Sequence, residues 1–275
     1  MKPKITKIYS ENADFQYLET LLRNRAKRNK ARQFLVEGVR PVTQALQYRW
    51  NIQALVYSRE KRLSDWAEAV LRDSQAPQHY ELPLALMKKL SQKEETSELL
   101  AVAAMAEDRL ERIPEQEPLL AVVFDRPNNP GNLGTIIRTC DAMGANGLVI
   151  TGHAVDLYDP ETIRATTGSF FAVPVIRQPS QNELLPWLDG LRQRHEQLQI
   201  VGTSARASQP IQEYDFTRPT VLLIGNENHG LSEAYRSLCD AMVTIPMAGG
   251  SASSLNAACA TAILLYEVTR QRRNG

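Results

Sequence analysis

The sequence has few cysteines and no long apolar run. Its three cysteines, Cys140, Cys239 and Cys259, show no Cys-x-x-Cys spacing and leave an odd number, so we expect free thiols in a reducing compartment. No segment approaches the roughly 20 apolar residues of a membrane span, and the amino-terminal residues lack the apolar core of a signal peptide. These absences predict a soluble, cytoplasmic protein.

The motifs of several enzyme classes are also missing. The chain has no G-x-G-x-x-G for a dinucleotide, no GK[ST] ending of a P-loop and no G-x-S-x-G nucleophile elbow. The four histidines lie far apart without metal-ligand spacing, so no metal site is expected: His79, His153, His195 and His229. The net charge of +1 neither favours nor excludes a nucleic-acid partner, which leaves local patches to decide.

Apolar segments alternate with helical patterns on both sides of the charged stretch "AEDRLERIPEQE". This stretch predicts a boundary, with one domain over residues 1–108, a linker over 109–117 and a second domain over 118–275. The expected strands lie at 33–38, 52–58, 99–105, 119–125, 147–151, 199–204, 220–227 and 242–246. The first domain reads as a small α/β module, and the second as α/β with a mostly parallel sheet covered on both faces.

Three loops of the second domain are rich in glycine, asparagine and proline. They are "DRPNNPGN" at 125–132, "GNENHG" at 225–230 and "AGGSASSLN" at 248–256, and each follows a predicted strand. Any one of them could be an ordinary turn, because glycine and asparagine tolerate a positive φ. Ligands of parallel sheets bind beyond the carboxyl ends of the strands, so the three loops together predict a binding site.

The residues around these loops form longer ordered motifs. They read "NNPGNLGTIIRTCDAMGANGLVI", "LLIGNENHGLS" and "IPMAGG…SSLNAACATAILLYE", and "VDLYDPETIRATTGSFFAVPV" lies between the first two. In order and spacing the four segments resemble the SpoU/TrmH family of RNA ribose 2'-O-methyltransferases, in the SPOUT superfamily. The resemblance implies a carboxyl-terminal methyltransferase domain folded as a deep trefoil knot, a rare topology, and a homodimer with its site near the interface.

The resemblance also implies a cofactor and a set of site residues. S-adenosylmethionine would lie against Gly225 and Asn226 of the second motif and Ile245, Met247 and Leu255 of the third. The catalytic set would be Asn132, Arg138, Glu227, Ser254 and Asn256, although helix N-capping also explains Ser254 and Asn256.

Two chemical roles stay open for Arg138. The family's arginine has been assigned as the general base, yet a guanidinium is not normally deprotonated in a protein. The alternative is that Arg138 clamps the adjacent phosphate and stabilises the developing alkoxide.

A basic stretch near the amino terminus, "RNRAKRNKARQFLVEGVRPVTQAL", is similar to the L30e-like substrate-binding domain that often precedes this catalytic domain. Its cations are expected to contact RNA phosphates, although a solvated helix face would explain them too: Arg23, Arg25, Lys27, Arg28, Lys30 and Arg32.

We therefore predict an S-adenosylmethionine-dependent RNA ribose 2'-O-methyltransferase. Ribosomal RNA is favoured over transfer RNA because of the L30e-like domain, which is an analogy of fold. A catalytically silent RNA-binding or ribosome-assembly factor is the main alternative, and the intact polar set of the three motifs argues against it. A nucleotide-dependent oxidoreductase would need the dinucleotide motif that the chain lacks.

Overall fold

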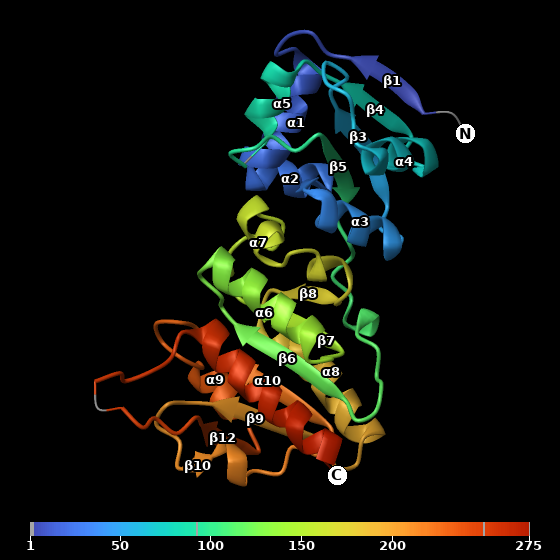
Figure 1. The fold of residues 1–275 in the computed structure, drawn as a ribbon. Helices are drawn as coiled ribbons and strands as arrows, with labels where there is room; N and C mark the ends of the chain where they lie inside the picture. Colours follow the sequence, from blue (N-terminus) through green and yellow to red (C-terminus); the bar gives the residue numbers. More distant parts are fainter. Residues whose placement is uncertain (1–2, 92, 250, 275) are drawn as a thin grey trace. The chain divides into compact units, whose positions relative to one another are not determined.

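The computed structural model describes residues 3–91, 93–249 and 251–274 (Figure 1). The chain forms two compact units, each with its own sheet. Unit 1 contains Met1–Ala106 and Tyr158–Ala172, and unit 2 contains Glu107–Leu157 and Val173–Gly275. In the described ranges, no helix combines the length and the apolar content needed to cross a bilayer.

Unit 1 is a five-stranded mixed sheet with helices. Its strands, in the order β1-β4-β3-β5-β2, are β1 (Lys4–Lys7), β4 (Gln78–Glu81), β3 (Ile52–Tyr57), β5 (Leu99–Ala104) and β2 (Gln33–Glu37). Its helices are α1 (Ala13–Arg23), α2 (Arg25–Ala31), α3 (Val39–Gln47), α4 (Asp65–Asp73), α5 (Leu84–Leu90), α7 (Pro160–Ala165) and the 3-10 turn η2 (Ser169–Phe171). Side chains of Asn12, Asn24 and Ser64 cap α1, α2 and α4, which explains where these helices begin.

Residues 158–172 belong to unit 1 although they follow the first of the four motif segments in the sequence. Their aromatic side chains pack on the sheet: the ring centroids of Tyr158 and Phe34 are 4.8 Å apart, and those of Phe170 and Trp50 are 5.4 Å apart. Trp50 Nε1 donates to the carbonyl of Phe171 at 3.1 Å. The predicted domain limits at 108 and 118 stay a prediction.

Unit 2 is a seven-stranded sheet in which every strand pair is parallel, as expected. The strands, in the order β10-β12-β9-β11-β6-β7-β8, are β10 (Gln209–Pro210), β12 (Ala241–Thr244), β9 (Gln199–Thr203), β11 (Thr220–Ile224), β6 (Leu120–Asp125), β7 (Gly147–Thr151) and β8 (Val175–Gln178). The helical elements are η1 (Leu110–Arg112), α6 (Pro130–Ala142), α8 (Gln181–Arg194), η3 (Ile211–Glu213), α9 (Glu233–Arg236) and α10 (Ala257–Asn274). All six residues of β6 are buried, as a central parallel strand requires.

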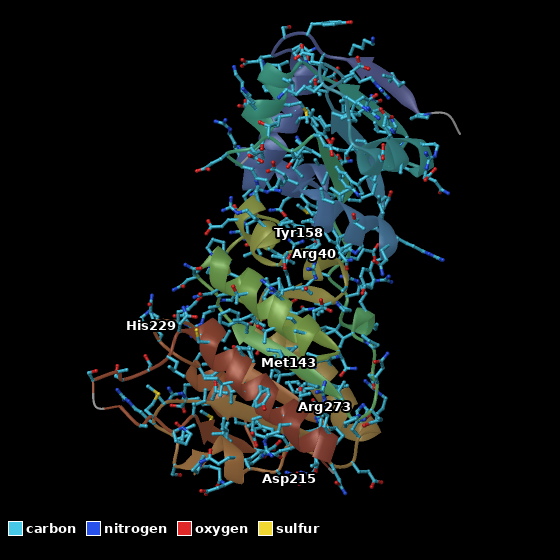
Figure 2. The ribbon with its side chains drawn as sticks, viewed as in Figure 1. Arg40, Met143, Tyr158, Asp215, His229 and Arg273 are labelled. Carbon is cyan, nitrogen blue, oxygen red and sulfur yellow. The ribbon has the colours of Figure 1, made fainter. Side chains whose placement is uncertain are left out.

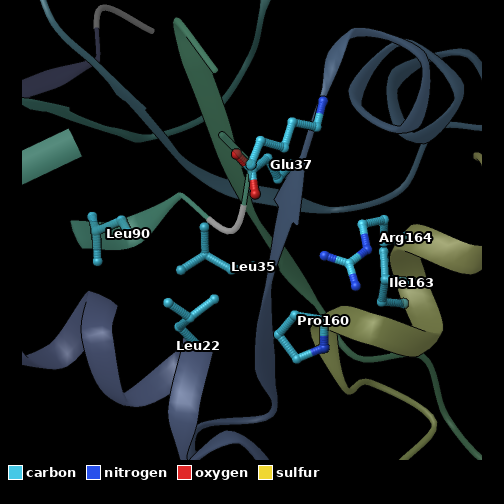
Figure 3. Close-up of a pocket in the computed structure, with 8 residues that line it drawn as sticks. Leu22, Leu35, Glu37, Leu90, Pro160, Ile163 and Arg164 are labelled. Carbon is cyan, nitrogen blue, oxygen red and sulfur yellow. The ribbon is translucent and has the colours of Figure 1, made fainter. Parts of the chain in front are cut away.

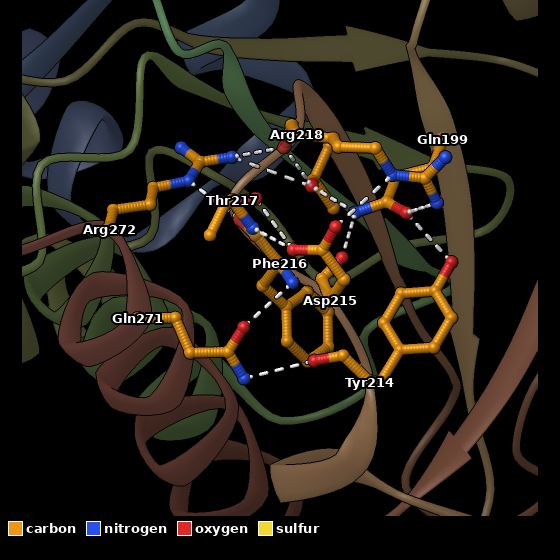
Figure 4. A network of polar contacts seen from close by, with 9 residues as sticks. Gln199, Tyr214, Asp215, Phe216, Thr217, Arg218, Gln271 and Arg272 are labelled. Carbon is orange, nitrogen blue, oxygen red and sulfur yellow. Dashed lines mark hydrogen bonds and ion pairs between the residues drawn. The ribbon is translucent and has the colours of Figure 1, made fainter. Parts of the chain in front are cut away.

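Helices α6 and α10 pack side by side in unit 2 (Figure 1). The last turns of α10 are anchored at the amino edge of the sheet, where β6, β9 and β11 begin (Figure 4). The guanidinium of Arg272 donates to the carbonyls of Pro118, Leu119, Phe216 and Arg218 at 2.7 to 3.0 Å. Burial lowers the pKa of Arg272 to about 10, so the group stays charged at neutral pH. The trefoil knot stays a prediction.

Candidate active site

Three loops leave the sheet of unit 2 at its carboxyl edge. They follow β6, β11 and β12, and because these strands belong to one parallel sheet, their carboxyl ends share an edge. We call residues 126–129 the first loop, 225–232 the second and 245–256 the third. All predicted catalytic and cofactor residues lie in the second and third loops or on α6, the helix that follows the first loop.

The first loop leads directly into α6. Asn129 caps this helix, because its Oδ1 accepts the backbone N–H of Asn132 at 2.8 Å. Pro130 occupies the first turn, where its missing N–H costs no helical hydrogen bond. The dense run of asparagine and proline therefore sets the start of α6 and places Asn132 within its first turn. Free N–H groups at such a helix start favour an anionic ligand.

Asn132 stands at the centre of a hydrogen-bond chain that joins all three loops. Its Nδ2 donates to Glu227 Oε1 in the second loop at 3.3 Å, and its Oδ1 accepts Asn256 Nδ2 from the third loop at 3.0 Å. Glu227 Oε2 also accepts the backbone N–H of Asn128 in the first loop at 3.1 Å. Three of the predicted polar residues thus meet in one place, although 124 residues separate Asn132 from Asn256.

Arg138 lies on the same helix but on another side of it. Six residues correspond to about 600° of helical rotation, so the side chains of Asn132 and Arg138 point roughly 120° apart. Arg138 is exposed, and no hydrogen bond or ion pair joins its side chain to any other residue in the described ranges. Its five N–H donors are therefore available to a ligand.

The second loop is folded tightly on itself. Asn226 forms a bridge with Gly230, and its Oδ1 accepts the N–H groups of Asn228 and His229 at 2.9 and 3.1 Å. A Cβ on Gly225 would collide with the backbone of Gly230 and Leu231, so only glycine allows the two sides of the loop to come this close. His229 marks this loop in Figure 2, away from Arg273 near the end of α10.

The third loop exposes apolar side chains. Met247 and Leu255 are each 37 % exposed, while Ile245 is half-buried where β12 has just ended. Ser254 is exposed and has no hydrogen-bond partner within the described part of the chain. Asn256 has two roles, because its Oδ1 caps α10 through the N–H of Ala258 at 2.8 Å while its Nδ2 reaches Asn132. The simpler N-cap interpretation therefore holds for Asn256 without excluding a place in the site.

Comparison with known proteins identifies these loops. The model of the SpoU rRNA Methylase family matches residues 119–266, and that of the SpoU L30e-like domain matches residues 12–101. The chain belongs to the SpoU rRNA methylase family. The predicted family, the α/β fold and the activity class, an RNA 2'-O-methyltransferase that uses S-adenosylmethionine, are thereby confirmed.

Individual relatives resemble the chain over almost its whole length. It is 47 % identical over 273 residues to the 23S rRNA (uridine(2479)-2'-O)-methyltransferase of Streptomyces viridochromogenes, covering 99 % of this chain and 95 % of the relative. It is 30 % identical over 247 residues to the 23S rRNA (guanosine(2553)-2'-O)-methyltransferase RlmP of Bacillus subtilis, covering 90 % and 92 %. The crystal structure of the SpoU methyltransferase AviRb from Streptomyces viridochromogenes with AdoMet matches with a TM-score of 0.88 and 46 % identity, covering 96 % of this chain and all of that one.

The carboxyl edge of this SpoU domain suits the cofactor chemically. An adenine ring needs apolar surfaces on its faces and main-chain groups at its edge. Met247 and Leu255 supply apolar side chains that no core covers, and the tight turn at Gly225 brings main-chain groups close together. The individual assignments to cofactor and catalysis stay predictions, and they are taken up as proposals below.

Two residues of this edge were not foreseen from the sequence. Asp125 is 2 % exposed at the end of β6, and both its carboxylate oxygens accept from the guanidinium of Arg126 at 2.9 Å. This hydrogen bonding raises the pKa of Arg126. An aspartate directly after five buried apolar residues is a signal that could have found the pair, because buried carboxylates need partners.

The cations expected to bind RNA lie on and around α2 of unit 1, and they divide into two kinds. Five are exposed: Arg23, Arg25, Lys27, Lys30 and Arg32. Arg28 is 2 % exposed and donates to the carbonyls of Leu21 and Leu22 at the end of α1 at 3.1 and 2.9 Å. Because these carbonyls and Asp159 hold its guanidinium, Arg28 has a structural role, and the expected phosphate contact does not fit its position.

Unit 1 also contains a hollow between α7 and the β2 strand (Figure 3). Its empty volume is about 370 Å³ including open solvent, and its apolar lining residues Leu22, Leu35, Leu90 and Ile163 are buried. Only the rim carries charge, from Glu37, Lys93 and Arg164. The buried lining offers little apolar surface to a ligand, so this hollow is not the site of the chemistry.

Proposed function

We propose that the chain transfers a methyl group from S-adenosylmethionine to a ribose 2'-hydroxyl of large-subunit ribosomal RNA. The two relatives described above are both 23S rRNA 2'-O-methyltransferases by name, which supports this substrate class. The observation that carries the proposal is the hydrogen-bond chain Glu227–Asn132–Asn256. It joins the second and third loops to α6, the helix that also carries Arg138, whose side chain has no partner in the described ranges. A ribosomal substrate would place the protein in the cytoplasm.

The proposed chemistry needs positioning above all. The cofactor, when bound, supplies a methyl group on a positively charged sulfur, so the chain need not provide a metal or a covalent nucleophile. The residues proposed to hold it are Gly225, Asn226, Ile245, Met247 and Leu255. Asn132, Glu227, Ser254 and Asn256 would hold the ribose and its phosphate in line, and such positioning can lower a barrier by up to roughly 7–11 kcal/mol.

For Arg138 we favour the clamp over the general base. Guanidinium groups keep their proton in proteins, and Arg138 is exposed rather than buried where its charge would be disfavoured. A charged arginine can hold a phosphate through two parallel hydrogen bonds and stabilise negative charge that develops on the 2'-oxygen. The proton of the hydroxyl then leaves to solvent as the oxygen–methyl bond forms and the sulfur–methyl bond breaks.

We also propose that the enzyme acts as a homodimer through α10. Four of the exposed residues of this helix, Cys259, Ile263, Tyr266 and Arg270, recur every three or four positions and form one stripe. Ile263 and Tyr266 are 39 % and 58 % exposed, whereas Leu264 and Val268 of the same helix are buried in the core. Sedimentation should show a dimer for the wild type and a monomer for Ile263→Glu with Tyr266→Glu. A monomeric wild type would refute the dimer.

Methyl transfer to RNA from cells that lack this protein tests the function. Radiolabelled S-adenosylmethionine would be incubated with total RNA or ribosomal particles, and the RNA separated by size and hydrolysed with alkali. Label in an alkali-resistant dinucleotide from 23S rRNA is the expected result, because a 2'-O-methyl group blocks cleavage at that ribose. Label in transfer RNA would move the substrate to that class. No transfer and no cofactor binding by calorimetry would favour a silent RNA-binding factor.

A further inference from the structure

The buried carboxylate of Asp125 contacts the first loop at Arg126 and the second loop at Ser232. Besides its two bonds to Arg126, Asp125 Oδ2 accepts the backbone N–H of Ser232 at 3.0 Å, where the second loop ends. A buried carboxylate is costly unless it is paired and hydrogen-bonded, and here both conditions are met. Asp125 therefore ties the end of β6 to the far end of the second loop.

Arg126 extends this connection through its backbone. Its carbonyl accepts Asn226 Nδ2 at 2.6 Å, at the start of the second loop, and its N–H donates to the carbonyl of Thr151 at 3.0 Å. The stem of its side chain covers Gly152, where an added Cβ would lie 2.8 Å from Arg126 Cγ. The φ of Arg126 is +51°, a left-handed conformation that costs a residue with a side chain about 1 kcal/mol or more. Hydrogen bonds to Asp125, Thr151 and Asn226 hold Arg126 in this conformation.

These bonds fix the second loop at both ends against the first. Asn226 is bound near one end of the second loop and Ser232 at the other, while Glu227 between them reaches Asn128 and Asn132. The bonds of Asn226 to Arg126 and of Ser232 to Asp125 are partly buried, whereas the bond of Asn128 to Glu227 is exposed. Bonds shielded from water hold a geometry more firmly than exposed ones, so the Asp125–Arg126 pair sets the register of the two loops.

We propose that Asp125 is a positioning residue for methyl transfer. Its carboxylate, acting through Arg126 and Ser232, holds the second loop where Gly225 and Asn226 meet the cofactor and Glu227 meets Asn132. Asp125 itself touches neither substrate nor cofactor. The inference deepens the proposed function and rests on it.

The Asp108–Arg177 pair provides a matched control in the same unit. Asp108 accepts the side chain of Arg177 at 2.7 and 3.0 Å and also a backbone N–H, that of Arg177, at 3.0 Å. The two aspartates thus have the same kinds of partner, but Asp108 has no hydrogen bond or ion pair with the described residues of the three loops. Asp125→Asn and Asp108→Asn remove the same charge from full-length protein with little change in volume.

Calorimetry with S-adenosylmethionine and single-turnover methyl transfer to the RNA substrate would separate the two pairs. Asp125→Asn should weaken cofactor binding about ten-fold and slow transfer at saturating cofactor by at least as much, as expected for one lost charge-assisted bond. Asp108→Asn should change only the urea midpoint. Asp125→Asn with wild-type affinity and rate, or Asp108→Asn with equal losses, would overturn the inference. A wild type that neither binds cofactor nor transfers methyl would overturn the proposed function, and this inference with it.

Discussion

Two arginines of unit 2, Arg272 at the amino edge of the seven-stranded sheet and Arg138 on α6, differ in the partners of their side chains. At the amino edge, the guanidinium of Arg272 donates to backbone carbonyls, and the side-chain amide of Gln271 bonds the backbone of Tyr214 and Phe216 beside it (Figure 4). On α6, the helix that starts at the carboxyl edge, Arg138 is exposed and its side chain has no partner among the residues that the structure describes. The difference shows where to look for function. We call a basic side chain committed when hydrogen bonds within the protein hold it and it stabilises the fold. We call it uncommitted when it is exposed without a partner in the described ranges and can bind a ligand.

The contrast recurs on α2 of unit 1. Arg28 is buried against carbonyls of α1, whereas Lys27 and Lys30 are exposed and make no side-chain hydrogen bond or ion pair in the described ranges. Sequence alone gave these three cations equal standing, because composition does not report which side of a short helix faces the core.

Removing the uncommitted arginine should have the largest effect. Arg138→Ala should lower the rate of methyl transfer about 100- to 1,000-fold, as loss of a group that stabilises transition-state charge typically does. Arg138→Lys should not restore it, because an ammonium cannot form two parallel bonds to a phosphate. Arg273→Ala, which removes an exposed arginine near the end of α10, is the control. The midpoint of urea unfolding should be the same for all three variants. A loss of stability in Arg138→Ala would contradict the claim that Arg138 serves a ligand and not the fold.

Removing the committed arginine should affect stability instead. Arg272→Ala removes a donor from four backbone carbonyls, of which that of the buried Phe216 keeps no other hydrogen-bond partner in the described ranges, and should lower the free energy of unfolding by about 1–3 kcal/mol. Transfer per folded molecule should stay at the wild-type level. Equilibrium urea unfolding beside Arg273→Ala measures the first part. An Arg272→Ala variant with normal stability and a reduced rate of methyl transfer would contradict the structural role that we assign to Arg272.

Opening the tight turn of the second loop should have a smaller, local effect. A methyl group at Gly225 collides with backbone atoms, so Gly225→Ala must open the loop and should weaken cofactor binding about ten-fold. Gly190→Ala, in α8, meets only the end of the Arg194 side chain and should bind normally. Isothermal calorimetry compares them. Equal affinities would show that the shape of the second loop does not matter to the cofactor.

Neutralising two uncommitted lysines should have the smallest effect, a change in the salt dependence of RNA binding. If Lys27 and Lys30 contact phosphates, Lys27→Gln with Lys30→Gln should reduce the slope of log K against log salt by about 0.7 to 0.9 per contact. Lys61→Gln, an exposed lysine elsewhere in unit 1, is the control. An unchanged slope in a filter-binding titration would remove α2 from the RNA surface.

Much of unit 2 could be predicted from the sequence, because its strands are continuous apolar runs. The expected strand at 147–151 has the bounds of β7, and those at 119–125 and 220–227 differ from β6 and β11 by one and three residues at one end. Strands β8 (VIRQ) and β10 (QP) were missed, since neither strand contains more than two apolar residues in a row. The three loops were found because their composition departs so far from ordinary turns.

Long-range packing could not be predicted in this way. Nothing local to residues 158–172 shows that Phe170 and Phe171 pack on the sheet of unit 1, because an aromatic pair is equally at home in either core. The buried partners of Arg28 and the connections of Asp125 depend on segments distant in sequence. Sequence motifs therefore named residues of the site, while the structure separated those that form it from those that support it.

Hydrogen–deuterium exchange of the full-length protein with and without S-adenosylmethionine tests the central claim most directly. We expect added protection in peptides that cover the three loops at 126–129, 225–232 and 245–256, and no change at the amino edge around Thr220 and Arg272. Protection confined to the amino edge, or to unit 1 alone, would contradict the assignment of the carboxyl edge as the active site.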